Sequence, residues 1–121
     1  MALRLLSEAE QLLPTTVPHA ATHSAYYAMF HAARAVLVQA EGASAPTTHK
    51  MVVSRFGYLA KQANDAALTE AGRMLATGLQ RRLRSDYDTD HPVPPAEATA
   101  AVKEARRFLE TCARLHGFPP P

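Results

Sequence analysis

The sequence predicts an all-α protein, a bundle of four to five antiparallel helices in up-down order. Gly is scarce, and residues that favour helices, such as Ala, Leu, Glu, Gln and Arg, fill the segments between the prolines. Apolar residues recur in these segments at spacings of three and four, which places them on one helix face. The 121 residues, 47% of them hydrophobic, suit one domain, expected at residues 1–117 before a Pro-rich tail at 118–121.

Prolines and glycines divide the chain into five segments of helical length, because Pro ends a helix and Gly weakens one. The punctuating positions are Pro14 and Pro18, residues 42–46, Asn64 and Asp65 with Gly72, and Pro92, Pro94 and Pro95. The expected helices lie at roughly residues 2–13, 18–41, 47–62, 66–88 and 95–116. Thr47 or Thr48 is the expected N-cap of the third helix, and Gly117 the expected C-cap of the fifth.

The second segment is expected to be the central helix, because it is apolar on two sides. A stripe of small side chains contains Ala21, Ala25, Ala28, Ala32 and Ala35. A bulky apolar stripe contains Tyr26, Met29, Phe30, Ala33, Leu37 and Ala40. A single polar ridge contains Ser24, Tyr27, His31 and Arg34. The small stripe allows a neighbouring backbone to approach closely.

The last two helices carry apolar seams that suit antiparallel neighbours joined by short loops. The fourth has Leu68, Gly72, Leu75, Leu79 and Leu83 on one side. The fifth has Ala98, Ala101, Ala105, Phe108, Cys112 and Leu115. Cys112 is then most simply a buried apolar residue, and as the single cysteine it excludes an intrachain disulfide.

Charge and hydropathy narrow the class of protein. The net charge of +2 does not by itself indicate a nucleic-acid binder, but Arg outnumbers Lys by ten to three. This ratio fits either phosphate binding or a genomic composition bias, and one sequence does not separate the two. His31 and Arg34 interrupt the longest apolar run, and the N-terminus lacks a signal-peptide pattern. We therefore expect a cytoplasmic protein with no membrane partner.

The segment from Arg84 to His91 carries groups that suit RNA cleavage without a metal ion. Such cleavage needs a base for the ribose 2′-hydroxyl, an acid for the leaving oxygen and a cation beside the phosphorus. The imidazole of His91 exchanges protons near neutral pH, and the guanidinium of Arg84 binds phosphate oxygens. Asp86 and Tyr87 lie between them and can orient both. A structural alternative pairs Arg84 with Asp88 and makes His91 a loop residue.

Three blocks of the sequence resemble the HEPN domain family in order and spacing. They are Ala25-Tyr-Tyr-Ala-Met-Phe-His-Ala-Ala-Arg34, Thr48-His49-Lys50 and Arg84-Ser-Asp86-Tyr87-Asp88. The match extends from Leu5 to Leu115, and its first block is the most specific. The resemblance implies a bundle of four or five helices that forms a homodimer. It also implies a metal-independent endoribonuclease toxin, paired with a nucleotidyltransferase-fold antitoxin of the MNT type.

The active site of that family is an Arg-x4–6-His motif duplicated across the dimer, and Arg84 and His91 match its longest spacing. The family usually has Asn, Asp or His directly after the Arg, where this chain has Ser85. In some members a Tyr after the His is adenylylated, whereas Tyr87 precedes it. The departure directly after Arg84 favours the alternative function, a catalytically inactive HEPN module that binds RNA or nucleotide, or an accessory subunit of a nucleotidyltransferase.

RNA contacts are expected from the polar ridge of the second helix and from the fourth helix. Tyr27, His31 and Arg34 share a helix face and can line one cleft. Arg81 is a further candidate, as part of a basic rim. Each has a structural alternative: Tyr27 as a core aromatic, His31 bonded to a buried carboxylate, and Arg81 with Arg82 on a solvated face. The solvated face is favoured for the two arginines.

Histidines elsewhere are given structural roles. His49, near the start of the third helix, is expected to buttress the bundle. His19, His23 and His31 could share a helix face, but no Glu-x-x-His pair or cysteine supports a metal site there. We therefore expect neither a metal nor a cofactor.

Overall fold

The structure is a computed structural model that describes residues 1–12, 18–87 and 93–116. Its elements are α1 (Ala2–Leu12), α2 (Pro18–Glu41), a short 3-10 turn η1 (Gly42–Ser44), α3 (His49–Ala63), α4 (Ala66–Tyr87) and α5 (Pro95–His116). These described ranges contain five α-helices and no strand, which confirms the all-α prediction. The observed bounds lie within two residues of the expected ones.

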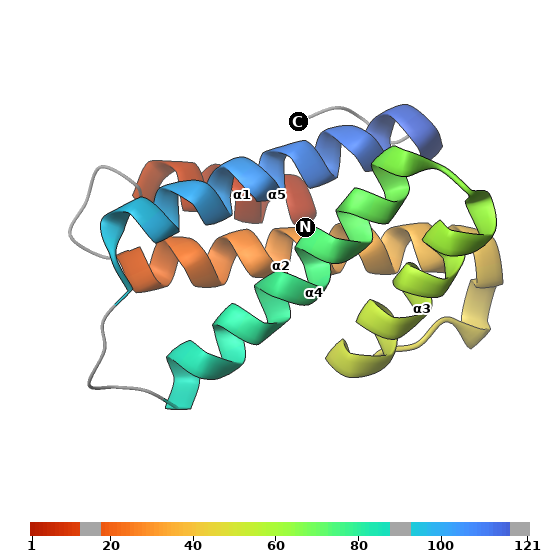
Figure 1. The fold of residues 1–121 in the computed structure, drawn as a ribbon, viewed down its shortest axis with the longest axis horizontal. Helices are drawn as coiled ribbons and strands as arrows, with labels where there is room; N and C mark the ends of the chain where they lie inside the picture. The colour runs from red at the N-terminus through yellow and green to blue at the C-terminus, as the bar shows by residue number, and fades with distance from the viewer. Residues whose placement is uncertain (13–17, 88–92, 117–121) are drawn as a thin grey trace.

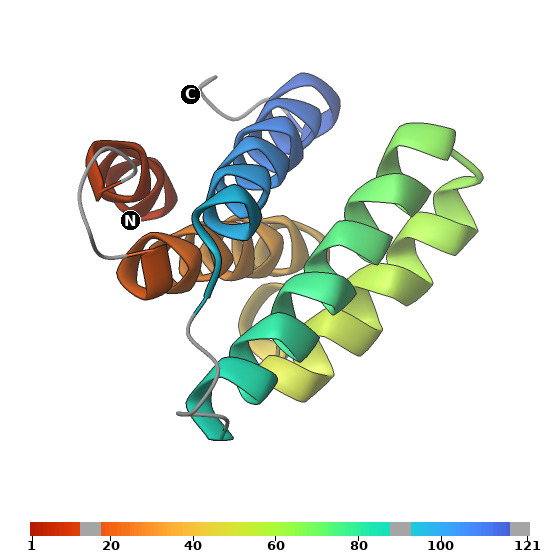
Figure 2. The same cartoon turned by 60° about the vertical axis from the view of Figure 1, so that its left-hand side comes forward.

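α2 is the central helix, as its pattern predicts, and it contacts each of the other four α-helices. α1, α2 and α5 lie along a common direction in Figure 1, and the α3–α4 hairpin is inclined across them. Figure 2 shows α3 and α4 side by side as an antiparallel pair. The apolar residues of α2 therefore face two layers, one formed by α1 and α5 and the other by α3 and α4.

The two apolar stripes of α2 are buried except at their C-terminal ends. Ala21, Ala25 and Ala28 are completely buried, whereas Ala35 of the small stripe and Ala40 of the bulky stripe are exposed. The seams of α4 and α5 likewise end one turn early, at the half-exposed Leu83 and Leu115 (both 39% exposed). Because α1 and α5 cover the small stripe within one chain, that stripe gives no support to a two-fold interface.

α4 crosses α2 closely at Gly78. A Cβ atom built at Gly78 would lie 2.8 Å from Met29 Cε and 3.2 Å from Tyr26 Cδ1. Glycine allows this approach without displacing the end of Met29 or the ring of Tyr26. Arg82 follows one turn later on the same side of α4, so the crossing brings its side chain over α2.

The α3–α4 junction is tighter than the sequence suggests. Asn64 ends α3 in the left-handed conformation, with a φ of 51°. Asp65 then caps α4, because its Oδ1 accepts a hydrogen bond of 2.9 Å from the Leu68 backbone N–H. At the other end of α3, Thr48 occupies the N-cap position without a side-chain hydrogen bond. The expected C-cap at Gly117 lies outside the described residues.

Candidate functional site

A cluster of aromatic and histidine side chains lies where α2, α3 and α4 meet, and we call it the His49 cluster. Its members are His23, Tyr26, Tyr27, Phe30 and His31 of α2, His49 of α3 and Arg82 of α4. Five of these residues fall on neighbouring turns of α2, and the first residue of α3 packs against them. The cluster is thus built from three segments that are distant in the sequence.

His49 is held in two ways. Its Nδ1 lies 2.8 Å from the Tyr26 hydroxyl, which is hydrogen-bond distance. Its ring stacks on Phe30, with centroids 4.1 Å apart and planes inclined by 22°. Tyr26 is only 2% exposed, whereas His49 is half-buried. The buried side of the imidazole is therefore fixed by the core, and the rest of its ring stays accessible.

Arg82 covers the two tyrosines. Its guanidinium carbon lies 5.1 Å from the ring centroid of Tyr27 and 5.8 Å from that of Tyr26, within the range of cation–π attraction. Tyr27 is half-buried and meets His49 edge to face, with centroids 5.4 Å apart. The cluster thus combines a fixed cation with a partly accessible aromatic surface.

Burial and nearby charges favour the neutral form of two imidazoles of the cluster, His49 and His31. Burial lowers the pKa of His49, and the charges of Arg82, His31 and His23 lower it further. The pKa of His31 is also lowered, first by burial and then by the N-terminal ammonium group and Arg34. Burial raises the pKa of Tyr26 to about 12, although Arg82 opposes this shift. At neutral pH, each of these imidazoles offers one lone pair and one N–H group.

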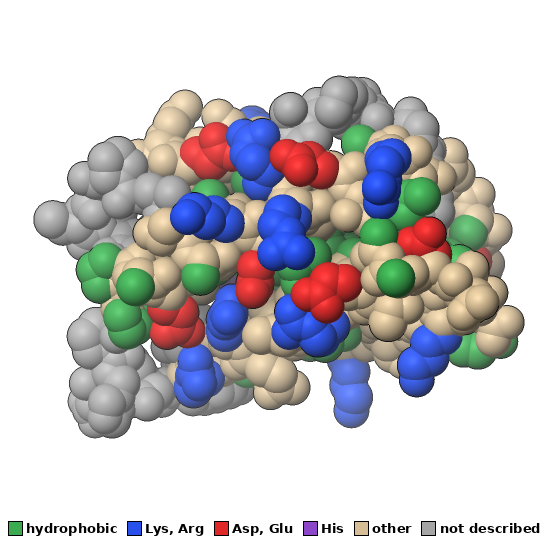
Figure 3. Space-filling view, turned by 45° about the horizontal axis from the view of Figure 1, so that its top comes forward, with side chains coloured by type: hydrophobic (Ala, Val, Ile, Leu, Met, Phe, Trp, Pro, Cys, Tyr) green, Lys and Arg blue, Asp and Glu red, His purple; other side chains and the backbone are tan. Residues whose placement is uncertain are grey.

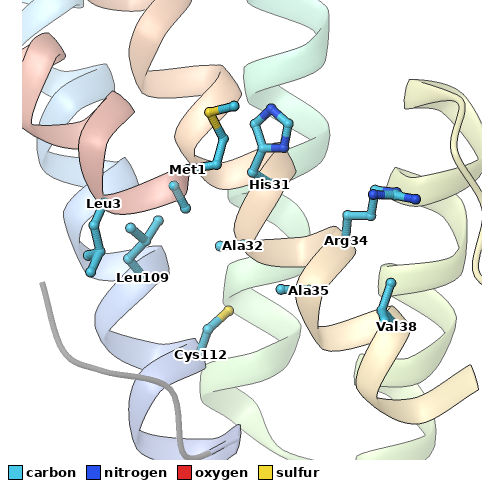
Figure 4. A pocket seen from close by; sticks show the side chains of 10 residues that line it. Met1, Leu3, His31, Ala32, Arg34, Ala35, Val38, Leu109 and Cys112 are labelled. Carbon is cyan, nitrogen blue, oxygen red and sulfur yellow. The ribbon is translucent and has the colours of Figure 1, made fainter. Parts of the chain in front are cut away.

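Arg34 lies apart from the cluster, although it shares the polar ridge of α2. With His31 it lines a pocket of about 440 Å³ between α1, α2 and α5. The other lining residues are Met1, Ala2, Leu3, Ala32, Ala35, Val38, Leu109 and Cys112. Figure 4 shows His31 beside Met1 at one end of this pocket, and Arg34 on its α2 side. His31 therefore borders both sites, whereas Arg34 borders only the pocket.

Arg81 and Arg84 face α5. Arg84 donates a hydrogen bond of 3.1 Å from Nη2 to Glu97, although its side chain is 68% exposed. Arg81 donates from Nη1 to Glu104 at 3.0 Å and lies 3.9 Å from Glu97. The face that carries α5 mixes acidic and basic side chains rather than forming a uniform basic patch (Figure 3).

The comparison with known families agrees with the observed fold. The HEPN domain matches residues 1–115, nearly the whole chain. This protein belongs to the HEPN domain family. The HEPN chain is also 32% identical, over 106 residues, to a protein of Methanocaldococcus jannaschii named "Putative toxin MJ0605". The alignment covers 87% of this chain and 75% of that relative. No solved structure matches.

Some of the expected site residues of this HEPN protein lie outside the residues that the structure describes. His91 and the side chains of Asp86 and Tyr87 fall outside the described residues, so their proximity to Arg84 stays a prediction. The structure brings Tyr27 and His31 into one cluster. It places Arg34 at the neighbouring pocket, and Arg81 and Arg84 beside the glutamates of α5.

Sequence reasoning did not assign Arg82 or His49 to the site. Arg82 was expected on a solvated face, yet it is half-buried over two tyrosine rings. His49 was given a buttressing role, which its contacts with Tyr26 and Phe30 fit, but the same contacts also present it at the site. Two features of the sequence could have indicated these residues. Gly78 lies one turn before Arg82 and permits a close helix crossing. The hydroxyl of Tyr26, in the bulky apolar stripe, needs a hydrogen-bond partner when it is buried.

The described part of the HEPN chain offers no metal site. Three of its histidines lie near one another, but no three His, Cys, Asp or Glu residues there form a group that could hold a metal ion. None of the helices in ranges 1–12, 18–87 and 93–116 combines the length and apolar character that crossing a membrane requires.

Proposed function

We propose that this HEPN protein is a toxin that cleaves RNA without a metal ion, in a toxin–antitoxin pair with an MNT-type nucleotidyltransferase. The observation that carries the proposal is the His49 cluster, where Arg82 lies over Tyr27 beside neutral imidazoles. Single-stranded RNA is bound by just such groups, since bases stack on aromatic rings and guanidinium groups bind phosphates. Membership of the HEPN family and a relative that carries a toxin's name support the same function.

The proposed catalytic residues are Arg84 and His91, with Asp86 and Tyr87 orienting them. Arg84 is accessible to a phosphate because most of its side chain is exposed. Its guanidinium would stabilise the charge that develops on the non-bridging oxygens, and His91 would transfer a proton. Tyr27 and His31 are proposed to contact RNA bases.

Assembly is part of the proposal. A homodimer would bring two copies of the C-terminal end of α4 to one cleft, with Arg84 near the two-fold axis. Light scattering should then give a mass of twice 13.1 kDa. A monomer mass at every concentration would contradict the dimer.

A second candidate function is RNA binding without cleavage. The ion pair between Arg84 and Glu97 favours it, because a carboxylate at 3.1 Å already neutralises the cation that cleavage needs. In this alternative the cluster binds RNA while the end of α4 has only a structural role.

Incubation of the purified protein with total RNA in EDTA tests the proposal. The wild type should leave 2′,3′-cyclic phosphate ends and should not cut DNA, which lacks the attacking hydroxyl. Arg84→Ala and His91→Ala should each slow cleavage by about a hundredfold or more, whereas Arg114→Ala, an exposed control on α5, should not.

Three outcomes would count against the proposal. Equal cleavage by all four proteins would indicate a contaminant or another active site. RNA binding without cleavage by the wild type would select the binding module. If expression of this protein arrests growth and co-expression of an MNT-type nucleotidyltransferase from the same genome never relieves the arrest, the toxin–antitoxin pairing is contradicted.

A further inference from the structure

We propose that the pocket between α1, α2 and α5 binds a small carboxylate whose apolar body contains about eight to ten carbon atoms. Arg34 binds the carboxylate group, and the apolar lining buries the rest of the ligand. The site lies beside the His49 cluster, with His31 at the border of both. Its ligand is not part of the proposed function, which leaves the pocket and Arg34 unused.

The size and lining of the pocket suit such a ligand. Its volume of about 440 Å³ falls in the range of small-molecule sites. At about 30 Å³ for each non-hydrogen atom, the share of a water molecule in the liquid, it holds up to about fifteen atoms, so octanoate and decanoate both fit. Figure 4 shows Leu3 and Leu109 on one side of the pocket and Val38 on the other, with the small side chains of Ala32 and Ala35 between them.

Two large apolar side chains of the lining are exposed to water. They are Leu3 of α1 and Val38 of α2, which belong to different helices but border the same pocket. Exposed apolar side chains that gather around a hollow mark a binding site more often than single ones do. An apolar ligand between them would remove part of both from water, which favours binding.

Arg34 provides the polar part of the site. Its Nε atom is buried, and no residue in the described ranges accepts a hydrogen bond from it. A buried N–H group without an acceptor is costly, so an acceptor from outside the protein would lower the free energy. The side chain as a whole is only half-buried, which leaves the guanidinium group open to a ligand in the pocket. A carboxylate matches a guanidinium group because two oxygens can accept from two N–H groups.

The charge of the lining favours an anion. None of the described residues that line the pocket is acidic, so no carboxylate of the lining competes for Arg34. Burial lowers the pKa of His31, and the charges of the N-terminal ammonium group and of Arg34 lower it further. The charged groups that act on His31 are thus cations, which makes the potential at this end of the pocket positive.

A nucleotide suits the pocket less well. RNA bases are usually held by stacking on aromatic rings and by hydrogen bonds to their edges. The lining, as far as the structure describes it, contains no Phe, Tyr or Trp, and its polar side chains are those of His31 and Arg34. The pocket therefore favours a largely apolar anion over a base.

Nuclear magnetic resonance of the full chain with ¹³C-labelled leucine and valine methyl groups tests the proposal. Titration with sodium octanoate should shift the methyl resonances of Val38 and Leu109, which line the pocket, and the shifts should saturate with a Kd of about 1 mM or less. The methyl groups of Leu83, exposed on α4 and outside the lining, should not shift.

Arg34→Gln tests the carboxylate contact. The affinity for octanoate should fall by about tenfold or more, because a charge-assisted hydrogen bond is lost. The affinity for octan-1-ol, which has the same chain without the charge, should change by less than about twofold. Arg4→Gln is the matched control, since it removes an exposed charge of α1 outside the lining and should bind octanoate as the wild type does. Equal losses in both variants would show a general attraction of anions and would overturn the role of Arg34.

Ala35→Leu tests the apolar part of the pocket. Ala35 is exposed and lines the pocket, so a larger side chain there should fill the space without disturbing the core. Binding of both octanoate and octan-1-ol should weaken by about tenfold or more, whereas Ala40→Leu, an exposed change on α2 outside the lining, should bind both normally. Thermal unfolding should show that both variants are folded.

Four results would overturn the proposal, and none of them depends on RNA cleavage. The first is that octanoate leaves the methyl groups of Val38 and Leu109 unchanged. The second is that octan-1-ol binds as tightly as octanoate. The third is that adenosine or uridine monophosphate binds more tightly than octanoate and shifts the same methyl groups, which would make the pocket a nucleotide site. The fourth is that Ala35→Leu converts a dimer into a monomer while octanoate does not bind, which would show that a second copy of the chain covers the pocket.

Discussion

Gly78 of α4 lies against the ring of Tyr26 in α2, so close that a Cβ atom at position 78 would come within 3.2 Å of Tyr26 Cδ1. Tyr26 cannot easily yield, because its ring is buried and its hydroxyl is bonded to His49. The contact lets α4 approach α2 closely, one turn before Arg82 lies over the two tyrosines.

Gly78→Ala should therefore lower the stability of the fold. The added methyl group displaces Met29 and presses on Tyr26, and we expect a net loss of about 1 kcal/mol after the gain in helix propensity is subtracted. Urea unfolding of the variant measures this loss. Histidine resonances of His49 should shift as well, since its hydrogen-bond partner moves.

Gly57→Ala is the matched control for that experiment. Gly57 lies within α3, and a Cβ atom there would meet no atom within 4 Å. The substitution should stabilise the protein by about 0.5–1 kcal/mol, because Ala favours the helix. If both variants behave alike, the close approach at Gly78 has no energetic importance.

The stability of the fold should fall as the pH drops below about 6.5, the ordinary pKa of histidine. The folded-state pKa values of His49 and His31 are lowered, so the unfolded chain binds protons in a range where the folded chain does not. This contribution is complete above the unfolded pKa and is lost as the pH falls towards the lower folded pKa. Melting temperatures across this range measure it.

A variant identifies the histidine responsible. His49→Gln cannot titrate and should show a shallower fall of melting temperature with pH than the wild type. Arg82, His31 and His23 face His49, and Arg34 with the N-terminal ammonium group affects His31. An equally steep fall in His49→Gln would assign the effect to His31 or to other groups.

Asp65→Ala should destabilise the protein by about 1 kcal/mol. The Oδ1 of Asp65 accepts the Leu68 backbone N–H, and alanine cannot replace that bond. Chemical denaturation provides the measurement, and Asp65→Asn is the control because its side-chain oxygen can still cap α4. A loss of similar size in both variants would show that the cap is not the cause.

Glu97→Gln should strengthen RNA binding if RNA phosphates reach Arg84. The neutral amide competes less with a phosphate for the guanidinium than the carboxylate 3.1 Å away does, so we expect a severalfold lower Kd at low salt. Fluorescence anisotropy with a labelled single strand measures it. Glu110→Gln, which alters the Arg106 pair on α5, removes the same charge elsewhere. Equal effects of both changes would indicate net charge alone.

The helices of this protein could be predicted from the sequence because Pro and Gly separate them and their apolar spacing is regular. The sequence marked a break at Asn64 and Asp65, but the left-handed turn and the cap there appear only when the backbone is known. The ends of the seams were also misjudged. Leu83 continues the spacing of α4, yet its side chain is exposed rather than buried.

The site was less predictable than the fold. Tyr27 and His31 could be grouped because they share a helix face. The position of Arg82 depends on how α4 crosses α2, which local spacing does not encode. The partner of Tyr26 lies 23 residues away in another helix, so the role of His49 required the tertiary structure.

Tyr26 belongs to the core through its ring and to the candidate site through its hydroxyl. Evolution therefore has little freedom at this position: a replacement that preserves the packing, such as Phe, discards the hydroxyl, and one that preserves a hydroxyl, such as Ser, leaves a cavity. Selection for stability and selection for activity converge on one side chain. Among descendants of this protein, substitutions at Tyr26 should be rarer than at Tyr27, and they should be accompanied by changes at Gly78 or His49.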